Sequence, residues 1–456
     1  MEYKLRLDEG FKPAYVFVRD FLYDVDASQK GKQLKIALER NNGFTYVYET
    51  RVFEDGYKDD LNVFYVERII KSLLWIVGGY KIYICGSKTV YEQIKDIYKI
   101  NGKRHFDVDF MQKIYESDFE VVLVDEKDFP EAKECSLSVG RNLDGCRIGF
   151  DAGGSDVKVS AVVNGESIFS EEIVWLPKLN SDPVYHYEKI KEAMLLAASK
   201  MERVDAVGIS SAGIYVDNKI MVASLFIQVP DDAFNKHVKN MYIDIVKECF
   251  GDVLLEVATD GDVTALAGAM DLDDNQILGI AMGTSEAVGY IDEKGNIKGW
   301  LNELAFAPVD FNEDTIVDEW SGDYGVGCKY FSQDSVIKLA PRAGIELDEN
   351  LTLAEKLKVV QALMQNDDPR AIEVFETIGI YLGYTLAYYS LFYDIKHLML
   401  LGRVSSGKGG DLIISKAKEV INSEFKHLAD VNLFMPDEKA RRVGQSIAAA
   451  SLPKNK

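Results

Sequence analysis

The residues best suited to chemistry lie in a glycine turn that follows an apolar strand, within residues 147–163. They are Asp151, Gly153, Gly154, Ser155 and Lys158. Paired glycines let a backbone approach an anion and point N–H groups at it, and Lys158 lies where a cation can join them. Asp151 would repel a phosphate directly, so beside a phosphate it is best explained as acting through Mg²⁺ or its water shell. An ordinary hairpin, in which the glycines only satisfy turn geometry, explains the pattern equally well.

The segment after this turn is predicted to be a strand and not a helix. Apolar and polar residues alternate over 156–163, which is the period of a strand, and an Asn164-Gly165 turn leads into a third strand at 166–176. The dinucleotide-binding fingerprint and the P-loop both lead from a strand into a helix. The turn therefore belongs to a meander of strands and to neither of those motifs.

Asp260 is the candidate general base. A strand at 253–259 delivers it, and a small-residue helix with Gly261 and Asp262 at its start follows. A carboxylate held at a strand end and facing a cleft is well placed to accept a proton. A helix N-cap at Asp260 or Asp262 explains the same residues, and the local sequence alone favours the cap.

A second hairpin repeats the first design about 130 residues further on. An apolar strand at 277–282 enters Gly283, Thr284 and Ser285, and the chain returns as a strand. Each hairpin heads an α/β half of the chain. Two such bends can clamp a polyphosphate from both sides of a cleft.

A third glycine-rich loop follows the strand predicted at 397–401. Residues 402–410 nearly match the G-x-x-x-x-G-K pattern of a P-loop, with Lys408 as its lysine. However, Gly409 stands where Mg²⁺ coordination needs a Ser or Thr hydroxyl, and a P-loop NTPase presents this loop early in its domain. A P-loop NTPase centred on Lys408 is a minor alternative.

The composition favours an enzyme that acts on small molecules, and the length of the chain indicates two to three domains. The chain has 456 residues and a formal net charge of −22, so it would repel nucleic-acid backbones and anionic membranes. Its five cysteines are scattered and form no C-x-x-C pair, which indicates a reducing compartment and argues against a zinc cluster. No apolar run is long enough to span a bilayer. We expect a cytoplasmic protein without nucleic-acid or membrane partners.

The first 145 residues are expected to form an additional α/β domain. Strand-like runs occur at 14–18, 33–38 and 44–53, and helices and strands alternate after them. This order resembles the one predicted for 146–260, so the region is either a degenerate copy of the same unit or an unrelated α/β domain. Its strand content and slightly acidic charge argue against a helix-turn-helix DNA reader.

Residues 146–456 together resemble the ROK family of sugar kinases and regulators, within the actin-like, hexokinase-like ATPase superfamily. Residues 151–155 resemble the family's first phosphate loop, D-x-G-G-T, and residues 282–285 look like its second. Residues 259–266 are similar to the family's N-D-A-N-A-A-A-L. The resemblance implies that Asp260 is the catalytic base and that Thr259 lies beside the sugar.

The resemblance also assigns the adenosine and sugar loops. Leu401-Gly402-Arg403 stands where the family has its adenosine loop, which implies adenosine contacts for Gly402, Arg403 and Ser405. The family's G-E-x-G-H sugar loop appears as residues 302–306, which implies sugar contacts for Asn302 and Glu303.

Two departures concern the sugar side of the family pattern. Phe306 replaces the histidine of the sugar loop, and the zinc motif is reduced to a single cysteine, Cys328. We therefore expect no zinc site. ATP binding is better supported than the identity of the sugar.

These observations predict an α/β protein with an actin-like ATPase fold, in which two RNase H-like lobes surround a cleft and an N-terminal α/β domain is added. The expected domains are 1–145, 146–270 with the first phosphate loop and Asp260, and 271–456 with the second phosphate loop and the adenosine loop. The resemblance implies a sugar kinase that uses ATP and Mg²⁺ and allows a homodimer. The main alternative is a non-catalytic sugar or nucleotide sensor, with a DNA-binding repressor as its weaker form.

Overall fold

The computed structural model describes residues 3, 5–134, 139–436 and 438–454. They form two compact units: unit 1 is Met1–Cys135, Ile280–Val288 and Gly299–Met435, and unit 2 is Ser136–Gly279, Gly289–Lys298 and Pro436–Lys456. Each unit gathers stretches from different parts of the chain. The division into 1–145, 146–270 and 271–456 stays a prediction.

Unit 2 contains a five-stranded sheet of the order β11-β8-β5-β6-β7. Its strands are β5 Cys146–Ala152, β6 Asp156–Val163, β7 Glu166–Val174, β8 Ala206–Ser211 and β11 Leu254–Thr259. β5, β6 and β7 are antiparallel neighbours, while β8 lies parallel to both β5 and β11. Asn164 and Gly165 make the β6–β7 turn with φ of 48° and 86°, the left-handed values that such a two-residue turn needs. The predicted meander is confirmed.

Two helices cover one face of this sheet. They are α5 Pro183–Ala198 and α7 Met241–Phe250, and both contribute buried apolar side chains to the same core as the sheet. Two small strands, β9 Ile214–Val216 and β10 Lys219–Val222, pair with each other. The short helix α6 Asp231–Ala233 and a π-helical turn at Phe234–Val238 precede α7.

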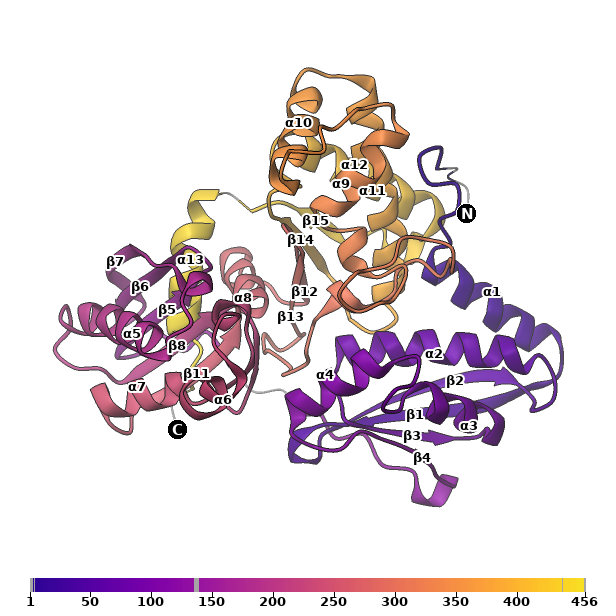
Figure 1. Cartoon of the computed structure of the whole chain (residues 1–456), viewed down its shortest axis with the longest axis horizontal. Helices are drawn as coiled ribbons and strands as arrows, with labels where there is room; N and C mark the ends of the chain where they lie inside the picture. The colour runs from indigo at the N-terminus through magenta and orange to yellow at the C-terminus, as the bar shows by residue number, and fades with distance from the viewer. Residues whose placement is uncertain (1–2, 4, 135–138, 437, 455–456) are drawn as a thin grey trace. The chain divides into compact units, whose positions relative to one another are not determined.

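Helix α13, Glu438–Ala450, packs against β5 and β8 (Figure 1). A Cβ atom at Gly149 or Gly208 would collide with the α13 carbonyls of Ser446 and Ala449. Glycine at these two strand positions therefore allows the close approach of the helix backbone. The neighbouring strand residues point the other way, because side chains alternate between the faces of a strand.

The N-terminal part of unit 1 is a four-stranded sheet of the order β2-β1-β3-β4. Its strands are β1 Gly31–Glu39, β2 Thr45–Phe53, β3 Lys81–Cys85 and β4 Glu120–Leu123, and its helices are α1 Ala14–Ala27, α2 Asp59–Ile76, α3 Lys88–Ile97 and α4 His105–Tyr115. β1 is antiparallel to both β2 and β3. In unit 2 the first strand, β5, is parallel to β8, which is the strand that follows the first long helix. This difference favours an unrelated α/β arrangement over a degenerate copy.

The strand predicted at 14–18 is wrong, because these residues begin helix α1. Their β-branched and aromatic side chains suggested a strand. The buried residues of the helix are Ala14, Val18, Phe21 and Val25, which follow helical spacing over a longer window. Pro13 immediately precedes the helix. Because the buried stripe packs as one face of a helix, tertiary packing outweighed the local strand propensity.

The rest of unit 1 holds the second hairpin and a group of helices. The sheet order is β13-β12-β14-β15, with β12 Ile277–Met282, β13 Glu286–Ile291, β14 His397–Leu401 and β15 Asn432–Phe434. The chain passes from unit 2 into unit 1 within β12 and back within β13. The helices are α9 Gln333–Arg342, α10 Leu353–Gln365, α11 Pro369–Tyr389 and α12 Lys408–Glu424, of which α11 and α12 pack side by side (Figure 1).

Among the described helices, none combines the length and the apolar character that crossing a membrane requires.

Candidate functional site

Three neighbouring strand ends in unit 2 gather carboxyl and hydroxyl groups. The register of the parallel strands places Asp151 beside Ser210, and Thr259 beside Ser211. Asp260 directly follows Thr259 as the first residue of α8 Asp260–Leu272. Because these strands run in the same direction, Asp151 and Asp260 lie at the carboxyl edge of the sheet, where open α/β sheets bind ligands.

The Asp151 carboxyl is buried and accepts two side-chain hydrogen bonds at Oδ1. Ser210 Oγ donates at 2.7 Å and Gln445 Nε2 at 3.3 Å. Burial raises the pKa of Asp151 to about 6, the Ser210 hydrogen bond opposes the rise, and the nearby Asp260 carboxyl adds to it. A divalent cation beside this carboxyl would offset the cost of its charge, so Asp151 fits a role in holding Mg²⁺.

Asp260 begins helix α8 without capping it. Thr259 occupies the N-cap position, and the Asp262 carboxylate accepts a hydrogen bond from Tyr290 N at 3.1 Å. Neither aspartate is therefore the N-cap residue of α8. Burial raises the pKa of Asp260, and hydrogen bonds from Gly261 N and from Thr259 oppose the rise. A carboxyl with a raised pKa is better matched to accepting a proton near neutral pH.

The first glycine turn closes as a hairpin, as predicted. Gly153 N donates to Asp156 O at 2.9 Å, and Trp175 Nε1 donates to Gly153 O at 2.8 Å. Gly154 and Ser155 are exposed at the tip. Ser155 Oγ donates to Asp156 Oδ2 at 2.8 Å, so the hydroxyl predicted to bind phosphate is engaged by a carboxylate of the same turn.

Two lysines lie next to this turn. Lys158 is directly opposite Asp151 in the β5–β6 register, and its Nζ is 3.8 Å from Asp156 Oδ1. Lys178 was not predicted, and its side chain passes over Gly154, where an added Cβ would lie 3.4 Å from Lys178 Cε. It is distant from the turn in sequence and reaches it only because β7 returns along the sheet, so no local pattern could have revealed it.

The second bend, in unit 1, also joins two strands. Gly283 N donates to Ser285 O at 2.9 Å, and Thr284 and Ser285 are exposed. Gly283 O accepts a hydrogen bond of 2.9 Å from Gln333 N at the start of α9. The start of a ten-residue helix thus fixes the bend, and its dipole adds a positive field there.

The predicted adenosine loop packs directly on the second bend. Val404 N donates to Met282 O at 3.0 Å, and Gly402, with a φ of 99°, lies too close to Met282 for any side chain. Arg403 is exposed, while Ser405 is buried and its Oγ donates to Gly402 O at 3.1 Å. The Ser405 hydroxyl therefore stabilises the shape of the loop.

The lysine of the near P-loop motif is engaged elsewhere. Lys408 Nζ donates to Asp367 Oδ1 at 2.7 Å and to Gln365 O at 3.1 Å, in the connection between α10 and α11. In a P-loop NTPase this ammonium reaches the phosphates that its own loop cradles. The contacts of Lys408 give no support to that alternative.

The predicted sugar loop belongs to unit 1, whereas the strand ends that carry Asp151 and Asp260 belong to unit 2. Asn302 is buried and its Oδ1 accepts a hydrogen bond of 2.9 Å from Tyr393 Oη, whereas Glu303 is half-buried. Thr259, the third predicted sugar contact, belongs to unit 2. The residues predicted to contact the sugar thus fall into two sets, one in each unit.

Glu286 is a charged residue that the sequence reasoning overlooked. It follows the Gly283-Thr284-Ser285 bend directly, 5% of its surface is exposed, and neither carboxyl oxygen has a hydrogen-bond partner among the described residues. Burial and then repulsion by Glu303 raise the pKa of Glu286. A glutamate inside the otherwise apolar return strand was the sequence signal for this position.

Cys328, the remnant of the zinc motif, is buried, and its Sγ lies 3.6 Å from Asp318 Oδ1. Within the part of the chain that the structure describes, no three His, Cys, Asp or Glu side chains are grouped so that they could hold a metal ion.

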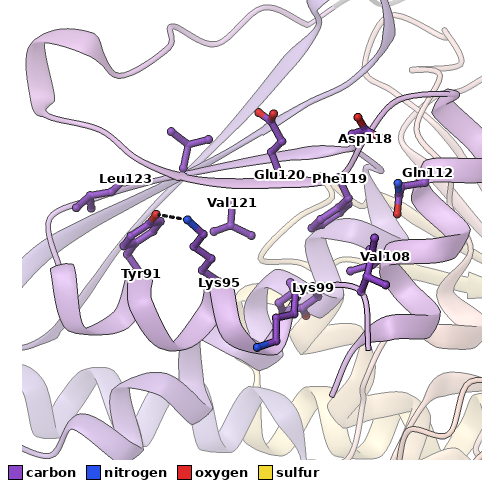
Figure 2. A pocket seen from close by; sticks show the side chains of 13 residues that line it. Tyr91, Lys95, Lys99, Val108, Gln112, Asp118, Phe119, Glu120, Val121 and Leu123 are labelled. Atoms are coloured by element: carbon purple, nitrogen blue, oxygen red, sulfur yellow. Dashed lines mark hydrogen bonds between the residues drawn. The ribbon is translucent and has the colours of Figure 1, made fainter. Parts of the chain in front are cut away.

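A separate hollow of about 840 Å³ lies in the N-terminal part of unit 1. Tyr91 and Lys95 of α3 and Val121 of β4 line it (Figure 2). Its lining residues fall between 91 and 123, so it includes none of the residues predicted to act in the site.

Comparison with known proteins gives structural matches and no sequence match. No protein-family model and no curated protein sequence matches the chain. The structure of a ROK hexokinase from Thermus thermophilus matches with a TM-score of 0.50 and 15% identity, over 67% of this chain and 97% of that chain. A ROK family transcriptional regulator, a homolog of the E. coli MLC protein, matches with a TM-score of 0.53 and 16% identity, over 68% of this chain and 79% of that chain.

Identities this low concern the fold alone, and the matched fold occurs in a hexokinase and in a regulator. The resemblance expected from the glycine turns is confirmed at that level. Over about two thirds of its length, this α/β chain has the fold that ROK kinases and ROK regulators share.

Proposed function

We propose that this chain is a sugar kinase that uses ATP and Mg²⁺ to phosphorylate a hydroxyl group of a hexose or amino sugar. The observation that supports this most is the pair of carboxyls, Asp151 and Asp260, at the carboxyl ends of β5 and β11, the two parallel strands that flank β8, each with a raised pKa. Phosphoryl transfer to an alcohol needs one carboxylate as a proton acceptor and another near the metal. The fold shared with a ROK hexokinase supports the same reaction class.

In this proposal Asp260 is the general base. Its carboxylate takes the proton from the sugar hydroxyl, the hydroxyl oxygen forms a bond to the γ-phosphorus, and the bond to the β–γ bridging oxygen breaks to release ADP. A sugar hydroxyl is a poor nucleophile at neutral pH, so a positioned base is the group this reaction needs most. Thr259, Asn302 and Glu303 would orient the sugar.

Phosphate binding is assigned to the two bends. Gly153, Gly154, Ser155 and Lys158 would act at one bend and Gly283, Thr284 and Ser285 at the other, while Gly402, Arg403 and Ser405 would contact the adenosine. Asp151 would hold Mg²⁺ through its water shell, and the bound ion would neutralise charge on the phosphates. Lys178 would be an additional cation among these phosphate-binding residues.

The substitution Asp260→Asn tests the base. It keeps the size of the side chain and removes its basicity, so turnover should fall about 10²-fold or more while ATP binding stays nearly unchanged. Asp262→Asn is the matched control, because it makes the same change at a carboxyl two residues further along α8, which accepts a hydrogen bond from Tyr290 N. Near wild-type turnover in Asp260→Asn would contradict the assignment.

A second candidate is a sugar- or nucleotide-sensing regulator without catalysis. The fold match to a ROK regulator, with a TM-score of 0.53, favours it as much as the hexokinase match favours a kinase. A sensor would bind the same ligands and release no ADP.

Three further features remain part of the proposal. They are an arrangement of two RNase H-like lobes around a cleft, a cytoplasmic location, and assembly as a homodimer. Each follows from the sequence resemblance or from the scattered cysteines, and each stays a prediction.

A further inference from the structure

The predicted sugar loop is attached by its backbone to the end of helix α2. Asn302 N donates to Ile76 O at 3.0 Å and Glu303 N donates to Trp75 O at 2.9 Å. The last carbonyls of a helix have no partner inside the helix. The last carbonyls of α2 therefore find their hydrogen-bond donors in the backbone of the two residues predicted to contact the sugar.

Aromatic packing fixes the next residues of the loop to the same helix. Phe306 is 4.5 Å from Trp75 and 5.6 Å from Phe106, measured between ring centroids, and 5.4 Å from Trp320. Trp75 is fully buried, and its Nε1 donates to Asp107 Oδ1 at 2.7 Å. The rings of α2 and α4 thus form the wall against which the loop lies.

A buried charge network holds α2, α4 and a later loop in one register. Asp323 lies 3.2 Å from Arg68 and 2.6 Å from Arg104, and Lys71 lies 2.6 Å from Asp107. Glu67 completes the group by pairing with Arg68 and Arg104.

All six side chains are at least nine-tenths buried, and three positive charges face three negative ones. If one of these side chains moved away, its partner would be left as a buried, unpaired charge. The network therefore tolerates little displacement.

We propose that α2 and α4 serve as a built-in scaffold that holds the sugar loop, residues 302–306, in the conformation that binds the sugar. This inference rests on the proposed function and extends it, because it gives the N-terminal segment a role in substrate recognition. Trp75 and Phe306 are positioning residues, since they act on the sugar through Asn302 and Glu303. The hydrogen bonds and ring contacts described above join the scaffold to the sugar loop, so disturbing the scaffold should change sugar affinity selectively.

The test compares two substitutions of the same kind in the full-length protein. Phe306→Leu shortens the side chain that packs on Trp75. Phe11→Leu makes the same change in another buried aromatic cluster of unit 1, where Phe11 packs on Tyr381 of α11 with 4.7 Å between ring centroids. Both changes leave a similar gap in an apolar cluster, but only the first borders the sugar loop.

Hydrogen exchange at the amides of Asn302 and Glu303 gives a readout that needs no activity. Phe306→Leu should raise their exchange rate roughly tenfold, because the helix–loop hydrogen bonds open more often. In the same variant the KM for the sugar should rise roughly tenfold, with the KM for ATP and kcat within about threefold of wild type. Phe11→Leu should leave the exchange and both KM values near those of wild type.

Equal effects of the two substitutions on exchange and on the sugar KM would overturn the scaffold. A rise in the ATP KM as large as that in the sugar KM would do the same. If the wild-type protein phosphorylates no sugar, the proposed kinase fails, and the exchange rates alone then decide whether α2 and α4 hold the loop.

Discussion

Replacing Asp151 by Asn should make the protein more stable at neutral pH while removing its activity. Burial raises the pKa of Asp151 from 3.8 to about 6, so the charged form that dominates at pH 7.5 is unfavourable in the folded state. A shift of this size corresponds to about 3 kcal/mol of folding free energy, since each pKa unit is worth about 1.4 kcal/mol. Asparagine keeps an oxygen that can accept the Ser210 hydrogen bond and carries no charge.

The sign of the effect follows from the direction of the shift. A carboxyl whose pKa is raised on folding stabilises the folded state below its unfolded pKa, and this contribution is lost as the pH rises through about 6. The advantage of Asp151→Asn should therefore approach about 3 kcal/mol at pH 7.5 and disappear near pH 4. Denaturant unfolding of both proteins between pH 4 and pH 8 measures this difference.

Asp205→Asn provides a control of opposite sign. A backbone hydrogen bond from Cys146 N, 2.8 Å long, lowers the pKa of Asp205, so this substitution should destabilise the protein at neutral pH and matter less in acid. A pH-independent effect of Asp151→Asn, or a loss of stability at pH 7.5, would refute the view that Asp151 carries a costly buried charge. Retained kinase turnover would refute its role with Mg²⁺.

Three further expectations can be checked separately. The kcat/KM should fall as the pH drops through about 6, because protonated Asp151 cannot hold Mg²⁺ and protonated Asp260 cannot accept a proton; a flat pH–rate profile from 5 to 8 would contradict this. Lys408→Ala should weaken ATP binding by less than about threefold in titration calorimetry, since the ammonium binds Asp367 and Gln365 O, and a complete loss would revive the P-loop alternative. Glu286→Gln should gain stability over wild type as the pH rises from 5 to 8, because the raised pKa of Glu286 makes the wild type lose stability over that window; parallel pH profiles of unfolding would contradict this.

The hairpins were predictable because their signals are local. Alternation over residues 156–163 and the Asn164-Gly165 turn specify a strand pair without help from the rest of the chain. The strand that delivers Asp260 could be recognised in the same way. Its neighbours Ser210 and Ser211 could not be assigned to it, since only the register of β8 and β11 brings them together.

Other features depended on contacts between distant residues. Local propensity gave a strand at 14–18, but the stripe from Ala14 to Val25 packs as a helix. Lys178 reaches the first bend through the return of β7, and the partners of the sugar loop come from α2, more than 200 residues earlier. A single sequence contains no local signal for pairings of this range.

The most direct test of the central claim is the release of ADP from ATP and Mg²⁺ by the purified full-length protein across a panel of hexoses, N-acetylhexosamines and polyols. We predict release that depends on one sugar or a few closely related ones and that falls about 10²-fold or more in Asp260→Asn. Sugar binding without any sugar-dependent release of ADP would contradict the kinase and identify a sensor.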